Sequence, residues 1–548
     1  MERRILLAIV LSFLVLVLYQ IIFIKKEAPT PEEKQELTPQ LSEKKGEEQA
    51  LEQESLLIPS QEEVSKEYPL IKEDEEREII IETSLYKAIW SNKGAVLKSL
   101  VLKKHKDDEG NELEIVSQLS KEIEKYPFSL KTQDPLFDAL ANNSLYFCSE
   151  SSVKLNKGEK KEISFKFSDE KGNSLEKILI FQDGKYEFQV EINLFKMSQR
   201  IEPFLLWGPS LRDPSPKEQK QRFGGGRGIA ILSADKIYRL DEKKFKAERS
   251  AFNFVIWAAY EDNYFTALFL TSSEKSSALF FKEQRDNKAY FFLAFDYPQK
   301  VFIGPKDFEA LKGFGFGANK LIKFGFFGFI AELLLHALKF IHRALPNWGV
   351  SIIILTLVIK ILFFPLTYTS TRSMAKMQEL QPKIKAIRAK YKKAKQDIAL
   401  RRKMNEEMMK LYKEHGINPA GGCLPLLIQI PIFWGFFRLL VVAVELRHSP
   451  FIFWIDDLSV KDPYYVTPIL MGITQFISQK MTPTSADPAQ ARMMLIMPFV
   501  MTIFFMNFQS GLVLYWLTNN VLQIVQQYLM NRLMKRKKRE AHGKRNKK

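Results

Sequence analysis

Five apolar segments dominate the last third of the chain and limit the folds that it can adopt. They cover about 348–369, 421–444, 464–480, 492–508 and 511–531. About 20 helical residues, rising 1.5 Å each, reach across the ~30 Å hydrocarbon core of a bilayer. A further apolar run, from Ile5 to Ile24, lies between basic pairs and lacks the small-residue cleavage site of a secretory signal. The pattern predicts a polytopic α-helical membrane protein with six spans, the first being an uncleaved anchor within 1–25.

Basic residues predict how these spans are oriented. The formal net charge is +17, and two segments carry it: 371–418 holds fourteen Lys and Arg against five acids, and 531–548 holds ten against one. Short basic segments beside a span stay on the cytoplasmic side of a membrane. Six spans then place both termini in the cytoplasm and the long segment after the first span outside it.

The long outer segment divides into three parts. Residues 26–78 are acidic, with scattered prolines and few aromatics, and predict a flexible linker. Residues 79–318 contain strand-like alternation, as in "KYEFQVEINLF", and are numerous enough for a core of their own. They predict an all-β sandwich, in which "RFGGGRG" at 222–228 is a surface loop because no Lys-Ser/Thr follows it. Residues 319–345 predict an amphipathic helix in the membrane interface, with a buried globular helix as the alternative.

The sequence gives little support to an enzyme. It contains no HExxH, CxxC or Walker A motif, and its two cysteines, Cys148 and Cys423, are expected to be free thiols. We therefore expect no catalytic residue, no metal, no cofactor and no small-molecule substrate.

Lys360 is the exceptional residue of the apolar segments. It lies in "SIIILTLVIKILFFPL", about ten residues or ~15 Å from either end of its span, roughly twice the reach of a lysine side chain. Thr356, four residues earlier, shares its helix face. No Asp or Glu lies in the five segments, whereas polar side chains recur, among them Gln429, Thr474, Gln475, Gln479, Thr502, Asn507, Thr518, Asn519, Asn520, Gln523, Gln526 and Gln527.

Two interpretations of these polar residues stay open. Each could form a separate interhelical hydrogen bond, with Lys360 brought to the interface by helix tilt. Together they predict a positively charged, hydrophilic pocket that opens to the cytoplasm and attracts an acidic or polar segment.

The basic segment between the second and third spans predicts a helical hairpin over 373–418. Apolar residues recur at heptad spacing in two arms, with a turn near Lys395–Gln396. A solvated hairpin explains the pattern, and methionines at Met377, Met404 and Met408 add possible contact with varied apolar partners. The basic tail, 535–548, suits anionic lipid or RNA phosphate equally, through Lys535, Arg536, Lys537, Lys538 and Arg539.

The same residues resemble the YidC/Oxa/Alb membrane protein insertase family, and closely its bacterial branch. The matching stretches include "NWGVSIIILTLVIK", "QPKIKAIR", "INPAGGCLPLLIQIPIF", "VELRHSPFIFWIDDLSVKDPYY", "PILMGITQFISQKMTPT" and "SGLVLYW". The resemblance implies a five-helix insertase core over 346–534, a periplasmic β domain of the Gram-negative type, and a cytoplasmic hairpin. Lys360 stands where most bacterial members have arginine, and Trp516 where many have tyrosine.

The resemblance also implies a function. We expect a chaperone and insertase of the cell inner membrane that acts on nascent membrane proteins, alone or with the Sec translocon, and contacts membrane lipids and the ribosome. The expected client-binding groove comprises Thr356, Lys360, Gln429, Phe433, Tyr515, Trp516, Thr518 and Asn519. An ion or solute channel around the same pocket is the alternative, and a scaffold organised by the β domain is a third possibility.

Overall fold

The computed structural model describes residues 70–219, 226–273, 275–296, 298–391, 397–416, 424–481 and 488–545. The expected first span and most of the expected linker therefore lie outside the described residues. The chain divides into Met1–Lys66 and Glu67–Lys548, and all elements below belong to the second unit.

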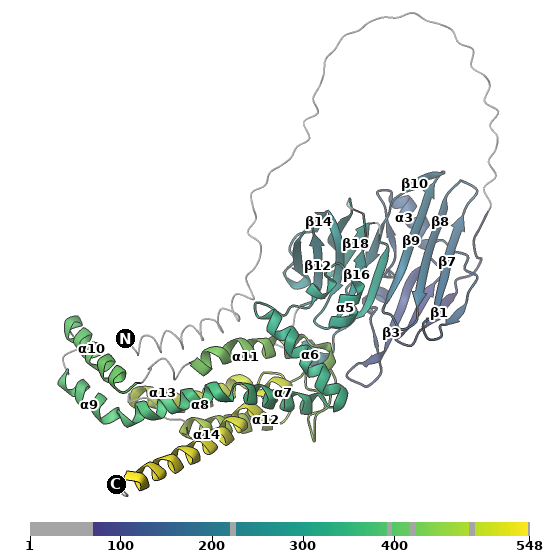
Figure 1. The fold of residues 1–548 in the computed structure, drawn as a ribbon. Helices are drawn as coiled ribbons and strands as arrows, with labels where there is room; N and C mark the ends of the chain where they lie inside the picture. Colours follow the sequence, from purple (N-terminus) through teal and green to yellow (C-terminus); the bar gives the residue numbers. More distant parts are fainter. Residues whose placement is uncertain are drawn as a thin grey trace, which may run out of the picture. The chain divides into compact units, whose positions relative to one another are not determined.

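Three β-sheets form the N-terminal half of the described chain (Figure 1). The first has the order β4-β3-β2-β1-β6, from β1 (Glu78–Glu82), β2 (Tyr86–Ser91), β3 (Val96–Lys106), β4 (Glu112–Glu114) and β6 (Ser152–Lys154). The third has the order β14-β17-β18-β11-β5, from β5 (Leu130–Lys131), β11 (Phe204–Trp207), β14 (Arg249–Asn253), β17 (Ser277–Arg285) and β18 (Lys288–Asp296).

The second and largest sheet has nine strands. Its order is β13-β12-β15-β16-β19-β9-β8-β7, and β10 also pairs with β9. Its strands are β7 (Lys160–Ser168), β8 (Ser174–Gln182), β9 (Glu187–Lys196), β10 (Gln199–Ile201), β12 (Gly228–Ser233), β13 (Lys236–Asp241), β15 (Val255–Glu261), β16 (Phe265–Leu270) and β19 (Lys300–Pro305).

A large hydrophobic core joins the three sheets of the β domain. It takes buried side chains from all three sheets, for example Trp90 from the first, Phe269 from the second and Phe295 from the third. The alternation noted in the sequence corresponds to β9, whose Phe188 and Val190 are buried in this core. The domain is not purely β, because it also contains α2 (Leu119–Glu122), α3 (Pro135–Asn143), α4 (Pro216–Gln219), η1 (Glu242–Lys244), α5 (Phe308–Phe314) and η2 (Ala318–Leu321).

The helix expected over 319–345 begins later than its sequence pattern predicts. η2 precedes it, Gly325 has a left-handed φ of +76°, and α6 (Gly328–Ala344) follows. One face of α6 buries Ala331, Leu334 and Leu338 and lies toward α11. The opposite face leaves Phe329, Leu333 and Phe340 exposed, so α6 is apolar on two sides.

Each of the five apolar segments contains an α-helix in the part that the structure describes. They correspond to α7 (Trp348–Leu362) with the start of α8 (Phe364–Glu379), α11 (Leu424–Val442), α12 (Val466–Met481), α13 (Pro488–Phe505) and α14 (Ser510–Arg545). Within the described residues no unbroken helix is both long enough and apolar enough to cross a membrane. α7 and α8 together have the required length and apolarity, but a 60° bend separates them. Pro365 follows the bend and has no N–H to continue the helical ladder.

α14 occupies the centre of this helical part. It contacts α7, α11 and α12, while α6 contacts both α7 and α11, and α13 lies against α12. At the α12–α13 contact, Gly472 lies directly against Thr502, which permits a close approach of the two helices.

α9 (Gln381–Lys390) and α10 (Ile398–Glu414) lie beside each other in Figure 1. Leu380, Ile384, Met408 and Tyr412 form a small buried cluster between them, with Met377, Ile387, Met404 and Leu411 packed around it. All of these residues except Tyr412 lie at the predicted heptad positions, which are 377, 380, 384 and 387 in the first arm and 404, 408 and 411 in the second. The expected turn near Lys395–Gln396 lies outside the described residues.

Candidate functional site

Lys360 is held by an amide rather than by an acid. Its Nζ donates a hydrogen bond to Gln523 Oε1 of α14 at 2.9 Å. Among the described residues no carboxylate forms an ion pair with Lys360. Thr356, one turn earlier, is buried and donates from Oγ1 to Ile352 O of its own helix at 2.6 Å. The lysine charge is therefore solvated by a neutral oxygen and is not cancelled.

A second polar contact joins α11 to the same face of α14. Gln429 Nε2 donates to Asn519 Oδ1 at 3.2 Å. Asn519 and Gln523 are four residues apart and so lie on one face of α14. This face therefore bonds to α7 through Lys360 and to α11 through Gln429. Asn520 lies on a neighbouring face and donates to Met471 O of α12 at 3.2 Å.

Trp516 continues the same face of α14 one turn before Asn519. Its ring meets Phe433 of α11 edge-on, with centroids 4.8 Å apart, and lies 5.2 Å from Phe505 of α13. Its Nε1 is buried and has no hydrogen-bond partner within the described residues. Leaving a buried N–H without an acceptor lowers the stability of the folded state by about 1–3 kcal/mol. An acceptor on a bound chain would remove this cost, so the indole N–H of Trp516 is an available donor beside the polar contacts.

The structure brings together only some of the residues that the sequence pointed to. Gln429 meets Asn519, and Phe433 meets Trp516, while Tyr515 is buried and stacks on Phe436 at 4.3 Å. Thr518 is half-buried. Gln523 is the partner that the expected groove set omitted, although its spacing of four from Asn519 and seven from Trp516 places it on their face.

The hairpin methionines occupy the seam between two helices. Met408 is buried there, and Met377 and Met404 are packed against the same cluster. Contact between Met408 and another chain would require the seam to open, whereas its neighbour Met409 is 48% exposed. In the basic tail, the α14 backbone continues to Arg545, and Arg536 is exposed. The side chains of Lys535, Lys537, Lys538 and Arg539 lie outside the described ones.

Comparison with known proteins covers both halves of the chain. Residues 340–538 match the family described as 60Kd inner membrane protein, and residues 78–337 match the YidC periplasmic domain. The membrane protein insertase YidC of Syntrophus aciditrophicus is 37% identical over 97% of this chain and 100% of its own length. The chain belongs to the YidC family of membrane protein insertases.

The chain is also similar to a second curated relative and to a solved structure. The membrane protein insertase YidC of Geotalea uraniireducens is 37% identical over 97% of this chain and 99% of its own. A crystal structure described as an active YidC insertase with the first transmembrane domain resolved is 20% identical, with a TM-score of 0.35, covering 85% of this chain and 95% of that one.

Membership of the YidC family confirms the resemblance drawn from the sequence. The chain is an inner-membrane protein with a periplasmic domain built of β-sheets, and its function is that of a membrane protein insertase. The channel alternative receives no support from these relatives.

Proposed function

We propose that this YidC-family chain receives the polar flank of a nascent membrane protein at Lys360 and releases the adjoining apolar segment into lipid. The observation that carries the proposal is the Lys360–Gln523 contact, in which an amide oxygen solvates the cation and leaves its charge uncancelled. A polar client segment can accept a charge-assisted hydrogen bond from Lys360, and an acidic segment also gains the attraction between opposite charges.

Further groups of the proposed client-binding groove lie along the same face of α14. Asn519 and Gln429 already share a hydrogen bond and can exchange it for one with a client backbone. The unused indole N–H of Trp516 supplies a donor for a passing carbonyl. Phe433 and Thr518 complete the proposed groove beside these donors, and the buried Thr356 and Tyr515 lie behind its surface.

Transfer of the client's apolar segment to lipid supplies the driving force. Burial of apolar surface yields on the order of 25 cal/mol per Å². The proposed exit lies along the lipid-facing sides of α11 and α13. This route breaks no covalent bond and needs no nucleotide from this chain, so the proposed activity is not enzymatic.

The proposal includes a topology of six spans with both termini in the cytoplasm. Its support is the concentration of positive charge in 371–418 and 531–548. The proposed domains are an anchor (1–25), a linker (26–78), a periplasmic domain (79–318), an interfacial segment (319–345) whose helix is α6, the insertase core (346–534, with the hairpin 373–418) and a tail (535–548). We further propose that the hairpin and tail meet the ribosome and anionic lipid, and that the core cooperates with the Sec translocon.

Substitution of Lys360 tests the proposal directly. In cells depleted of the native protein, Lys360→Ala is expected to reduce insertion of clients with acidic translocated tails at least about tenfold, because the amide groups that remain carry no charge. Lys360→Arg keeps the charge and should retain most of the activity. Lys480→Ala, at an exposed lysine of α12, is the matched control and should behave like the native chain. Normal insertion by Lys360→Ala would refute the assigned role.

A further inference from the structure

The turn between β15 and β16 forms non-covalent contacts that hold the β domain against α11. Its residues Glu261, Asp262 and Asn263 take part in two clusters of ionic contacts and in one direct hydrogen bond to α11. We call these contacts the joint; it comprises Arg212, Glu218, Arg239, Glu261, Asp262, Asn263 and Lys306 of the β domain, Lys323 before α6, and Arg438, Val441 and Arg447 in or after α11.

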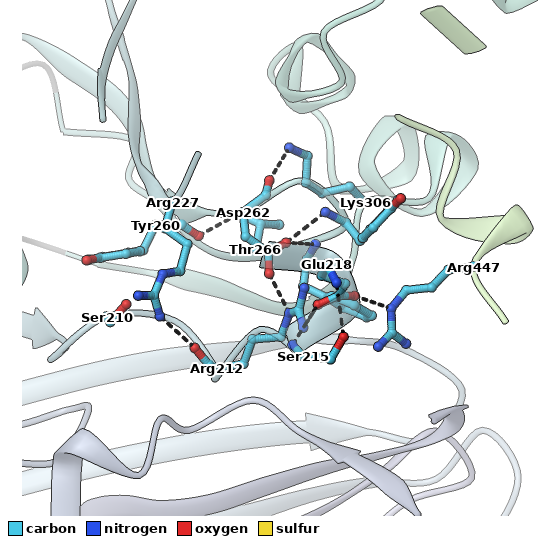
Figure 2. Close-up of polar contacts among 12 residues, drawn as sticks. Ser210, Arg212, Ser215, Glu218, Arg227, Tyr260, Asp262, Thr266, Lys306 and Arg447 are labelled. Atoms are coloured by element: carbon cyan, nitrogen blue, oxygen red, sulfur yellow. Dashed lines mark hydrogen bonds and ion pairs between the residues drawn. The ribbon is translucent and has the colours of Figure 1, made fainter. Parts of the chain in front are cut away.

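The first cluster bridges two guanidinium groups through one carboxylate. Figure 2 shows Glu218 between Arg212 and Arg447: Glu218 Oε2 accepts from Arg212 Nη1 at 2.7 Å, and Oε1 accepts from Arg447 Nε at 2.6 Å. Arg212 also donates to Asp262, whose other oxygen caps the turn by accepting from the backbone N–H of Tyr264 at 2.7 Å. The charged side chains are only 3–9% exposed, so water hardly screens these pairs.

The second cluster surrounds Glu261. Its carboxylate pairs with Lys306 at 2.8 Å, with Lys323 at 3.1 Å and with Arg239. The carbonyl of Lys323 in turn accepts from Arg438 Nε of α11 at 3.1 Å. A continuous series of polar contacts thus runs from the β15–β16 turn to the last turn but one of α11.

Direct contacts fix the end of α11 itself. Asn263 Nδ2 donates to Val441 O at 3.0 Å, satisfying one of the carbonyls that a helix C-terminus leaves unpaired. Val444, just after the helix, is 3% exposed and belongs to the hydrophobic core of the β domain. Lys339 of α6 lies 2.7 Å from both Asp307 of the β domain and Glu445.

α14 holds α11 less firmly than α6 does. α11 packs mainly against α6 and touches α14 at few points. The outer half of α11 is therefore attached to the β domain and α6 more strongly than to α14.

We propose that the joint is a positioning device, which anchors the outer half of α11 to the β domain and thereby sets how closely Gln429 and Phe433 approach Asn519 and Trp516. The consequence for insertion rests on the proposed function, because these are residues of the proposed client path. The positional claim concerns the free chain and does not depend on a client.

Crosslinking in the full-length chain tests the position of α11. Cysteines replace Gln429 and Asn519 in a chain whose Cys148 and Cys423 are changed to alanine, and a short bifunctional thiol reagent is added to the protein in lipid vesicles. A second pair, at Met471 and Asn520, reports the α12–α14 contact, which the joint does not touch. Arg447→Gln and Asn263→Ala weaken the joint at a buried charge and at a single hydrogen bond, and the second should fold even where the first does not. Glu283→Gln breaks the Lys125–Glu283 pair elsewhere in the β domain and is the matched control.

Both joint variants are expected to slow the α11–α14 crosslink at least threefold and to leave the α12–α14 crosslink unchanged, while Glu283→Gln changes neither. An unaltered α11–α14 rate would overturn the proposal. A parallel fall of both rates would also overturn it, because it would assign the joint to general stability. Insertion of a client into the same vesicles is measured separately, so a failure of the proposed insertase mechanism at Lys360 remains distinguishable.

Discussion

Lys177 shows how one buried charge can be accommodated in the β domain. Its side chain is fully enclosed, and its Nζ donates to three carbonyls, Gly94 O at 2.7 Å, Ala95 O at 3.0 Å and Phe128 O at 2.8 Å. An ammonium group has three N–H donors, so these acceptors match it fully. Burial nevertheless lowers the pKa of Lys177 to about 7.

Replacing Lys177 should therefore change both the stability of the β domain and its pH dependence. Lys177→Met leaves three buried carbonyls without a donor and is expected to lower the free energy of unfolding by about 2–5 kcal/mol. Between pH 7 and 10.5 the unfolded native chain binds a proton that the folded chain lacks, so native stability rises with pH across this window. The variant should lose this rise.

Urea unfolding at several pH values, monitored by hydrogen exchange in β8, measures both the free energy of unfolding and its pH dependence. Lys166→Met is the control, since this lysine pairs with Glu176 on the surface, where ion pairs contribute little. Equal stability of Lys177→Met and the native chain at pH 7 would contradict the role assigned to the three carbonyls.

Individual residues were only partly predictable from the sequence. Lys360 and Asn519 stand out because polar groups are rare in apolar helices. The joint does not stand out, because Glu261 and Arg447 look like ordinary surface charges and lie 186 positions apart in the chain. Their burial is a property of the tertiary fold, which local patterns do not carry.

The contact between α12 and α13 depends on the absence of a side chain at Gly472. A Cβ at Gly472 would collide with the Thr502 hydroxyl, so Gly472→Ala is expected to destabilise this helix pair by about 1–3 kcal/mol. Adding Thr502→Ala removes the colliding atom and should recover part of the loss. Thermal unfolding in detergent measures the series. Gly313→Ala, at a helical position with open space around its Cβ, is the control and should be neutral or slightly stabilising.

Whole elements were more predictable than single contacts. β9 follows from its alternation, and the α9–α10 seam follows from heptad spacing, because both patterns reflect one buried face. The start of α6 was misplaced since the apolar pattern continues through Gly325, whose left-handed backbone excludes a regular helix there. The short helices of the β domain have too few residues to show a period.

At the scale of the molecule, the order of the parts could be predicted but their connections could not. Composition separates a β domain from apolar helices. The largest sheet, however, places β19 between β16 and β9, and such distant pairings leave no trace in local sequence. The joint likewise links segments from both halves of the described chain.

Lowering the pH should weaken the joint, and with it the stability of the folded chain, in two stages. Burial, aided by the Arg447 guanidinium, lowers the pKa of His105 from 6.5 to about 4, and burial with Arg447 also lowers that of His448. The unfolded chain therefore takes up protons first as pH falls below 6.5, and stability declines.

The second stage comes from two carboxylates. Burial alone would raise the pKa of Glu218, but Arg212 and Arg447 hold it below 4.5, and Lys306, Lys323 and Arg239 do the same for Glu261. Their contribution is lost only below 4.5.

The melting temperature of the full chain should consequently fall from pH 8 to about 7, where the unfolded chain holds a proton on Lys177 that the folded chain lacks, and change little from 7 to 6.5. It should then fall gently to about 4.5 and steeply below that. Glu445 acts in the opposite direction, because burial raises its pKa despite Lys339, and its protonation favours the folded state. His105→Phe preserves the edge contact with Phe265 and should make the upper stage shallower without changing the lower one, because His448 still contributes to the upper stage. Glu218→Gln should weaken the lower stage and reduce stability at neutral pH, where Arg212 and Arg447 would share a neutral partner. A profile of His105→Phe identical to that of the native chain would show that the upper stage arises elsewhere in the molecule.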